Sequence, residues 1–488
     1  MGSAPSIDLA LVPASADEIN ADLHRRLARL RAAYEAEPYP SAALRKDRLR
    51  RGIDVLMSNE KRIVDALQAD FAGRAEPTTL LADVMVPIRA MRYAIRHLDR
   101  WMKPEKRKAD FPMGLIGAKT YIFYQPLGVI GIVAPWNAPL GLAFQPLAGA
   151  LAAGNRAMIK PSELTPNTSA LIADLTAKAY AVDEVDVVQG GIDVGSRFTA
   201  LPFDHLLFTG STRTARAVLR AAADNLTPVT LELGGKAPTI VAQGSDLEYA
   251  ASKIIGIKLT NAGQICMGPD HAMVHHSDRD RFVAAVEATF KRFYPDYANS
   301  SDVTRVFLPN QRRRLAALVQ DATDRGAKVI VATGDPMDSL AEIERFPLVV
   351  VVDPPADAAI MHEEIFGPVL PVLTYDTLED AVRQVRTRQR PLALYHIGGS
   401  ASEQQYLLKN THAGGVTFDD VMLHPLMHDL PFGGVGESGM GRHVGQAGFL
   451  ALSNGKSVAH RPWIDITKYL QPPYPPAMTK IMRWALRF

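Results

Sequence analysis

The sequence is poor in thiols and carries almost no excess charge. One cysteine stands among 488 residues, so an intramolecular disulfide and a metal site made of several thiolates are both excluded. Chains with so little cysteine are typical of a reducing compartment, and we expect a cytoplasmic protein. The 54 basic and 52 acidic side chains leave a net charge of +2, which gives no overall attraction to nucleic acid or to a membrane.

The sequence also lacks a leader and an uninterrupted apolar run. Residues 1–20 have no basic segment followed by an apolar core, so we expect no signal peptide. The range 126–154 holds no charged residue, but it is interrupted by Pro135, Asn137, Pro139, Gln145 and Pro146. A membrane-spanning helix rarely contains so many breaks. This stretch therefore predicts a buried strand, a tight loop and a buried helix.

The order of apolar segments indicates an α/β protein with more than one core, as the length also requires. Apolar residues recur at helical spacing in the first hundred residues, as at Leu23, Leu27, Leu30, Tyr34, Leu49, Ile53 and Leu56. Short β-rich runs then alternate with helical patterns, at 128–133, 156–160, 185–188, 205–209, 229–233, 328–332 and 347–352. We expect α/β domains built on parallel sheets.

Two segments between these blocks have their own patterns. Residues 113–125 predict a two-stranded β ribbon with glycines at its turn. Residues 89–101, RAMRYAIRHLDRW, predict a helix with a basic face. That face either attracts an anion or is an ordinary solvated helix surface.

The lone Cys266 lies in the segment 261–270, NAGQICMGPD, between glycines and a proline. A single cysteine in a long chain is often only a small buried apolar residue. This one is predicted to lie in a loop or at the end of an element. Such places can supply the access and the lowered pKa that a nucleophilic thiolate needs.

Glu232 is flanked by leucines at the end of an apolar run and is followed by two glycines. A carboxylate in an apolar pocket has a raised pKa and can act as a general base near neutral pH. The alternative is a structural glutamate that caps the following segment.

Four other segments offer polar groups at the ends of predicted elements. Asn137 stands between Pro135 and Pro139, where its amide can donate to an oxyanion or simply form a turn. The sequence Phe-Thr-Gly-Ser-Thr at 208–212 can receive a phosphate at a helix N-terminus, although it is not a G-x-G-x-x-G motif. Lys-Pro-Ser-Glu at 160–163 can hold ribose hydroxyls. Residues 363–368 pair two glutamates with a phenylalanine before Gly-Pro.

Taken together, these motifs resemble the aldehyde dehydrogenase superfamily. PWN, KPSE, FTGST, LELGGK, GQIC, EEIFGP and PFGGVGESGMG occur in that family's order over roughly residues 45–460. KPSEL, the Pro-Asp after the cysteine and HDLPFGGVGESGMG are most similar to the class-three group, which includes fatty-aldehyde and coniferyl-aldehyde dehydrogenases.

The resemblance implies a role for each motif residue. Cys266 is the implied nucleophile, Glu232 the base for the deacylating water, and Asn137 the side-chain half of the oxyanion hole. NAD is the implied cofactor, with NADP as a weaker alternative, and no metal is implied. The implied cofactor-binding residues are Pro135, Trp136, Lys160, Ser162, Glu163, Phe208, Gly210, Ser211, Leu233, Glu364 and Phe366.

Three positions depart from the family pattern. Ala215 stands where a glycine is usual, His271 where the class-three group usually has tyrosine, and Ile265 where it often has threonine. The last two flank the nucleophile, so they affect the expected substrate and not the expected reaction.

The implied architecture is aldehyde dehydrogenase-like, with two Rossmann-like α/β domains and a β-ribbon oligomerisation arm. Residues 1–104 and 124–233 are expected to form the dinucleotide-binding domain and residues 234–427 the catalytic domain. Residues 105–123 and 428–488 are expected to bridge subunits of a homodimer, with a tetramer as the alternative.

The implied reaction oxidises an aromatic or medium- to long-chain aliphatic aldehyde to the acid through a thiohemiacetal and a thioester. Two alternatives are a CoA-acylating enzyme and a catalytically silent scaffold. Glu232 argues against the first, because CoA-acylating relatives typically lack that base. The full Cys–Glu–Asn set argues against the second. A third alternative, a hydrolase that uses the free thiol, would not need the motifs at 160–163 and 208–212.

The C-terminal residues 477–488, AMTKIMRWALRF, predict a short amphipathic helix. Lys480, Arg483 and Arg487 share one face, and Ile481, Trp484, Ala485 and Phe488 share another. Such a helix can make weak, reversible contact with an anionic bilayer. The favoured alternative is a tail that packs on the partner subunit or covers the substrate entrance.

Overall fold

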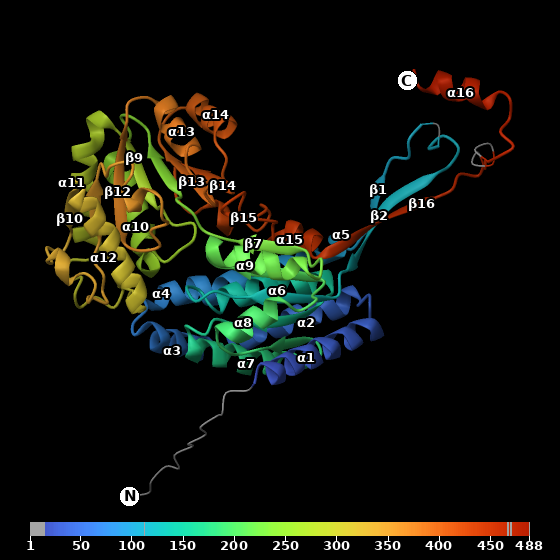
Figure 1. Ribbon diagram of the computed structural model, residues 1–488, viewed down its shortest axis with the longest axis horizontal. Helices are drawn as coiled ribbons and strands as arrows, with labels where there is room; N and C mark the ends of the chain where they lie inside the picture. Colours follow the sequence, from blue (N-terminus) through green and yellow to red (C-terminus); the bar gives the residue numbers. More distant parts are fainter. Residues whose placement is uncertain (1–14, 112, 466–467, 469–470, 488) are drawn as a thin grey trace, which may run out of the picture.

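The computed structural model describes residues 15–111, 113–465, 468 and 471–487 (Figure 1). The predictions for residues 1–14, including the lack of a signal peptide, and for Phe488 lie outside these residues. Three β-sheets organise the described chain: one of six strands, one of seven and one of three.

Helices form the start of the described chain, as predicted. They are α1 (Ala16–Ala36), α2 (Ala42–Met57), α3 (Glu60–Phe71), α4 (Glu76–Thr79), the π-helix η1 (Leu80–Met85) and α5 (Val86–Trp101). Ser15 and Glu18 form a capping box at the start of α1, with hydrogen bonds of 3.2 and 2.7 Å. Leu23, Leu27 and Leu30 are buried, which confirms the face of α1 that the spacing predicted.

The six-stranded sheet has the order β15-β7-β6-β3-β4-β5. Its strands are β3 (Val129–Val133), β4 (Arg156–Lys160), β5 (Val185–Val187), β6 (His205–Thr209), β7 (Val229–Glu232) and β15 (Gly439–Met440). β3 to β7 are parallel and β15 is antiparallel to β7. Five predicted strands are thus confirmed. The associated helices are α6 (Gly141–Ala153), α7 (Pro166–Ala179), α8 (Ile192–Thr199) and α9 (Thr212–Ala223).

The uncharged stretch 126–154 folds as predicted into β3, a loop and the buried α6, in which Pro146 lies inside the helix. From β3 the chain builds the sheet outward through β4 to β5, then returns to β6 on the other side of β3. The order of strands therefore reverses between β3 and β6. Ligands of open α/β sheets bind at such a point, outside the carboxyl ends of the strands.

The seven-stranded sheet has the order β10-β11-β12-β9-β8-β13-β14 and is parallel except for β10. Its strands are β8 (Pro238–Val241), β9 (His271–His275), β10 (Lys328–Val331), β11 (Val349–Val352), β12 (Val369–Tyr375), β13 (Ala393–Ile397) and β14 (Gly415–Phe418). Its main helices are α10 (Leu247–Leu259), α11 (Arg279–Phe293), α12 (Pro309–Asp324), α13 (Leu378–Arg386) and α14 (Ala401–Asn410). Figure 1 shows the two larger sheets side by side, each with its own helices.

The third sheet corrects the predicted ribbon. β2 (Lys119–Pro126) pairs with β1 (Glu105–Arg107) and with β16 (Ser453–His460), both antiparallel. The prediction of a two-stranded ribbon within 113–125 is therefore wrong, because 113–117 forms a turn and the partners of β2 come from elsewhere. A pairing across more than 300 residues leaves no local pattern that periodicity could reveal.

The C-terminal segment leaves the body after α15 (Gly445–Ala451) and β16. It ends in α16 (Met478–Ala485), which Figure 1 shows beyond the ribbon, on the side away from both larger sheets. Several apolar side chains there are exposed: Ile481, Met482, Trp484 and Leu486. No helix in the described part of the chain is long and apolar enough to cross a membrane.

Candidate active site

Cys266 lies in the loop between the 3-10 turn η2 (Thr260–Gly263) and β9. The backbone before it is strained, because Asn261 and Ala262 have φ angles of 51° and 53°. Residues that are not glycine adopt this left-handed conformation only where the surrounding structure enforces it, and such residues cluster at functional sites. Both residues are buried, so packing holds the loop that presents the sulfur.

Asn137 brings the first sheet to this loop. It follows β3, it is buried, and its Nδ2 donates to the carbonyl of Gln264 at 3.0 Å. Asn261 returns the contact by donating from its own Nδ2 to the carbonyl of Asn137 at 3.0 Å. Through these hydrogen bonds Asn137, the predicted oxyanion donor, contacts the loop at Gln264. Gln264 is two positions before Cys266, the predicted nucleophile.

Glu232 ends β7 and is buried, as the sequence indicated. Burial raises the pKa of its carboxyl group, while His443 and Arg442 act in the opposite direction. Nδ1 of His443 lies 2.9 Å from Oε1 of Glu232, and both side chains are at most 4% exposed. Oε2 of Glu232 has no hydrogen-bond partner among the described residues, so one oxygen remains available for a water molecule.

The sequence reasoning missed His443. It follows the motif at 431–441 by two residues, and only its spatial pairing with a residue 211 positions earlier gives it meaning. Tyr395 was missed for the same reason. Its buried hydroxyl donates to the carbonyl of Met267 at 2.6 Å and so fixes the backbone next to Cys266.

The surroundings of Cys266 disfavour the thiolate form of its side chain. Burial of the sulfur raises its pKa to about 12, and the nearby carboxylates of Glu364 and Glu232 contribute to the rise. The backbone N–H groups of Cys266 and Met267 oppose it. The sequence suggested that this loop could lower the pKa of the thiol, but the pKa is raised, first because the sulfur is desolvated and second because two acidic groups lie near it.

Glu364 lies at the centre of these groups. Burial raises the pKa of its carboxyl group to about 7, and the backbone N–H of Gly235 opposes the shift. A side chain on Gly234 would place its Cβ 2.0 Å from Oε1 of Glu364. Glycine at 234 therefore permits the close approach of this carboxyl group to the end of β7, and a larger residue would displace the end of the Glu364 side chain.

A buried ion pair fixes the segment that presents Glu364. Nζ of Lys236 lies 2.6 Å from Oδ2 of Asp270 and also donates to the carbonyls of Ile360 and Glu363, at 2.8 and 2.9 Å. Asp270 accepts a further hydrogen bond from the N–H of Ile365 at 2.8 Å. Lys236 of the LELGGK motif thus connects the loop after β7 to the EEIFGP motif.

Two aromatic residues of the predicted set meet at the same place. The rings of Trp136 and Phe366 lie edge to face with centroids 5.6 Å apart. Phe366 has a φ of 48° and is, after Asn261 and Ala262, a third residue of this region in the left-handed conformation. Pro135 precedes this tryptophan in the β3 loop, and Leu233 is buried directly after Glu232.

The remaining predicted residues lie at the carboxyl ends of β4 and β6. Lys160 is buried, and its Nζ lies 3.2 Å from Oε2 of the partly exposed Glu163. Ser162 accepts at its Oγ from the N–H of Leu164 at 3.2 Å. All of these groups border the point at which the strand order reverses.

The turn after β6 leads directly into α9. The ring of Phe208 packs beneath Gly210, 2.6 Å from where a Cβ would stand. Ser211 caps α9 by accepting from the N–H of Thr214 at 3.2 Å. The first N–H groups of the helix lack intrahelical partners and can bind an anion.

The departures from the family pattern have simple settings. Ala215 is buried with Phe208 and Leu206 in the core beneath α9, so its methyl group fills apolar space. His271 is buried beside Asp270 and Arg388, and burial lowers its pKa to about 4. It is therefore neutral at physiological pH. Ile265 is partly exposed beside Cys266.

The comparisons with known proteins agree with this geometry. Residues 12–458 match the model of the aldehyde dehydrogenase family. A probable coniferyl aldehyde dehydrogenase of Pseudomonas aeruginosa is 42% identical, over 97% of this chain and 98% of its own. A substrate-bound structure of Staphylococcus aureus AldH superposes with a TM-score of 0.86 at 32% identity and covers 96% of this chain and 99% of its own. A Mycobacterium tuberculosis aldehyde dehydrogenase complexed with NAD+ gives 0.81 at 28%, over 93% and 92% of the two chains.

Proposed function

Because the chain belongs to the aldehyde dehydrogenase family, we propose that this oxidoreductase converts an aromatic or medium- to long-chain aldehyde into its carboxylic acid, with a thioester on Cys266 as the intermediate. The observation that carries the proposal is the meeting of three groups from distant segments. Two findings support this assignment: Asn137 donates a hydrogen bond to Gln264, two residues before Cys266, and the carboxylate of Glu232 lies near enough to the sulfur to raise its pKa.

In the first step the sulfur of Cys266 loses its proton and attacks the aldehyde carbon. Glu232 and Glu364 are the two carboxyl groups near enough to influence that proton. The oxygen of the former carbonyl then carries negative charge. The amide of Asn137 and the backbone N–H of Cys266 are placed to donate to it, once Asn137 releases the carbonyl of Gln264.

NAD is the proposed hydride acceptor, and NADP the weaker alternative. The residues at the carboxyl ends of the strands fit such a molecule, because a buried lysine and a carboxylate follow β4 and a capped helix N-terminus follows β6 at the same edge of the sheet. Lys160, Ser162 and Glu163 would hold the adenosine ribose. Phe208, Gly210 and Ser211 would hold the pyrophosphate, and Pro135, Trp136, Leu233, Glu364 and Phe366 would surround the nicotinamide end. When bound, the cofactor supplies the oxidising power by accepting hydride.

In the second step Glu232 removes a proton from a water molecule, which attacks the thioester carbon. The carbon–sulfur bond breaks, the thiolate of Cys266 leaves and the acid is released. The free Oε2 of Glu232 can accept the hydrogen bond of that water, while His443 holds Oε1.

The larger organisation is part of the same proposal. We assign residues 1–104 and 124–233 to the dinucleotide-binding domain, 234–427 to the catalytic domain, and 105–123 with 428–488 to contacts between the subunits of a cytoplasmic homodimer. The exposed apolar side chains of α16 support packing of this tail on a partner subunit. Contact with an anionic membrane is the weaker alternative for the same face.

The proposal is tested by following NADH absorbance with benzaldehyde, coniferyl aldehyde and octanal, with NAD and then NADP. Cys266→Ala should bind NAD and keep its fold but lose turnover, because the chain has no second thiol. Retention of more than a few per cent of turnover would rule out the covalent route.

A further inference from the structure

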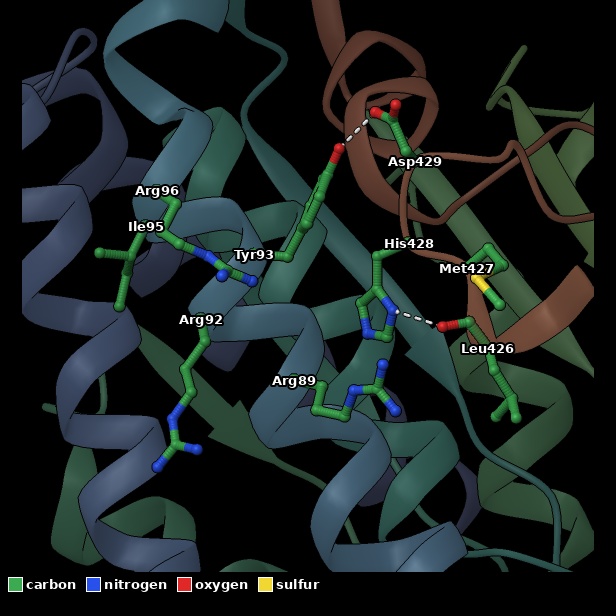
Figure 2. A pocket seen from close by; sticks show the side chains of 9 residues that line it. All are labelled: Arg89, Arg92, Tyr93, Ile95, Arg96, Leu426, Met427, His428 and Asp429. Carbon is green, nitrogen blue, oxygen red and sulfur yellow. Dashed lines mark hydrogen bonds between the residues drawn. The ribbon is translucent and has the colours of Figure 1, made fainter.

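A ligand-sized cavity that the proposed mechanism does not use opens beside α5. Its volume is about 660 Å³, within the range of small-molecule sites. Arg89, Arg92 and Arg96 of α5 line one side, and the segment 426–429 lines the other (Figure 2). We call this cavity the arginine groove. It lies on the basic helix face that the sequence left open between anion attraction and solvation.

The lining of the arginine groove carries a net positive charge, because it holds three arginines and one carboxylate, that of Asp429. None of its three guanidinium groups forms an ion pair with a carboxylate of the described residues, and Arg92 only contacts the sulfur of Met57 at 3.3 Å. The three arginines recur at spacings of three, four and seven residues, so like charges face one another along the helix. An anion between them would relieve that repulsion.

The only carboxylate that lines the groove is already engaged. Asp429 accepts a hydrogen bond from the hydroxyl of Tyr93, as Figure 2 shows. Burial lowers the pKa of His428, and Arg89 and Arg96 act in the same direction, while its hydrogen bond with the backbone of Leu426 opposes them. Leu426 and Met427 add apolar surface. The groove thus combines a cationic wall with an apolar one.

Contacts between side chains and backbone connect the wall of the arginine groove to the surroundings of both catalytic groups. On one side, His428 and Tyr93 pack on Gly445, where a Cβ would lie 2.0 Å from the carbonyl oxygen of His428. Gly445 is two residues from His443, the partner of Glu232. Two residues span at most about 7 Å, so this end of the groove lies close to the general base.

On the other side, the groove approaches the nucleophile. The ring of His424, two residues before Leu426, lies 6.3 Å from the ring of Tyr395. The hydroxyl of Tyr395 binds the carbonyl of Met267, next to Cys266. Tyr395 and His424 therefore connect the segment that lines the groove to the loop that holds the sulfur.

We propose that the arginine groove binds a carboxylate at the far end of the aldehyde, so that the preferred substrates are aldehydes with an anionic tail. This inference rests on the proposed aldehyde oxidation. Planar guanidinium groups suit carboxylates, and the apolar wall suits the hydrocarbon between the two ends. The chain's own C-terminal tail is a poor occupant, because Lys480, Arg483 and Arg487 would add positive charge.

The test compares suberic semialdehyde with its methyl ester, which share one chain and one aldehyde but differ in charge at the far end. At low ionic strength we expect kcat/KM to favour the acid about tenfold, since exposed ion pairs are individually weak and three act together. The preference should fall as salt is added, because salt screens exposed charges. Arg89→Gln, Arg92→Gln and Arg96→Gln combined should bring the ratio close to one.

Arg50→Gln is the matched control, because Arg50 is an exposed arginine on the neighbouring α2 and does not line the groove. It should retain the preference for the acid. The three single variants cover the case in which the triple variant does not fold, and each should lower the ratio. Equal use of acid and ester by the unmodified enzyme would overturn the inference while leaving aldehyde oxidation intact. Oxidation of neither compound, nor of benzaldehyde, would overturn both.

Discussion

The hydrogen bond between His443 and Glu232 should set the pH range of the second step. Burial raises the pKa of the Glu232 carboxyl group, and His443 limits that rise. His443→Phe keeps an aromatic ring but removes the donor. A hydrogen bond to a charged group is worth roughly 1.5–3 kcal/mol, and 1.36 kcal/mol corresponds to one pKa unit. We therefore expect the pKa of Glu232 to rise by about one to two units.

The sign of the effect follows from the role of the carboxylate. Below its pKa, Glu232 is protonated and cannot take a proton from water, so hydrolysis of the thioester stops. The acidic limb of the steady-state rate should then move to higher pH by about one to two units. The burst of NADH from the first turnover should persist, because acylation and hydride transfer precede that water.

The assay is stopped-flow absorbance of NADH between pH 5 and pH 9, with the burst amplitude and the steady rate measured separately. His443→Asn is the control, because its amide can donate from nearly the position of Nδ1 and should keep the limb where it is in the unmodified enzyme. A limb that does not move in His443→Phe, with the burst intact, would show that this histidine only fills space. An equal loss of burst and steady rate would assign it to the first step or to the fold.

Four other outcomes are expected. Glu232→Gln should show an NADH burst, a slow steady rate and an acyl adduct on Cys266 by mass spectrometry; loss of the burst would contradict its role as the water's base. Iodoacetamide should label Cys266 of the cofactor-free protein at pH 7 more slowly than free cysteine, because its pKa is raised to about 12; faster labelling would contradict this. Glu163→Gln should increase the use of NADP relative to NAD, because it removes a negative charge that would repel the 2′-phosphate of NADP. An unchanged ratio of NADP to NAD use would show that Glu163 does not contact the ribose. Asp270→Asn should lower the free energy of unfolding by about 3–5 kcal/mol in chemical denaturation, because Lys236 would remain buried without its partner, whereas the exposed Asp338→Asn should have little effect.

Local sequence patterns correctly predicted the features that depend on neighbouring residues, namely strands and the buried faces of helices. β4 and β6 have the bounds that apolar runs indicated, and the buried face of α1 follows from the spacing of its leucines. The motif residues also lie where a parallel sheet places them, because the carboxyl ends of neighbouring strands share one edge. The partners of β2 could not be predicted, because the sequence of one strand does not show which other strands pair with it or in which register.

The chemistry of the candidate site depends on pairings of the same distant kind. His443 follows a glycine-rich motif, and its role becomes evident only from its hydrogen bond with Glu232. Burying the charge of Lys236 would be costly without its ion pair with Asp270. The thiol shows the reverse case. Its loop looked favourable for a thiolate, yet burial, and after it the two carboxyl groups that fold against the sulfur, raise the pKa of the thiol. Electrostatics of this kind are set by the packing of several segments and not by the residues adjacent in sequence.

The position of the sulfur is therefore determined by hydrogen bonds between a loop of the six-stranded sheet and a loop of the seven-stranded sheet. Asn261 and Ala262 hold strained left-handed conformations immediately before it. Such strain persists only where other contacts fix it, and here those contacts come from elsewhere in the chain. Asn137 binds Gln264 from the β3 loop, while Nε2 of Gln264 donates to the carbonyl of Arg305 at 3.3 Å. If the β3 loop shifts when a cofactor enters, the loop of Cys266 must respond, because the same two asparagines connect them. The loop after β3 and the loop of Cys266 are therefore held together by the side chains of Asn137 and Asn261.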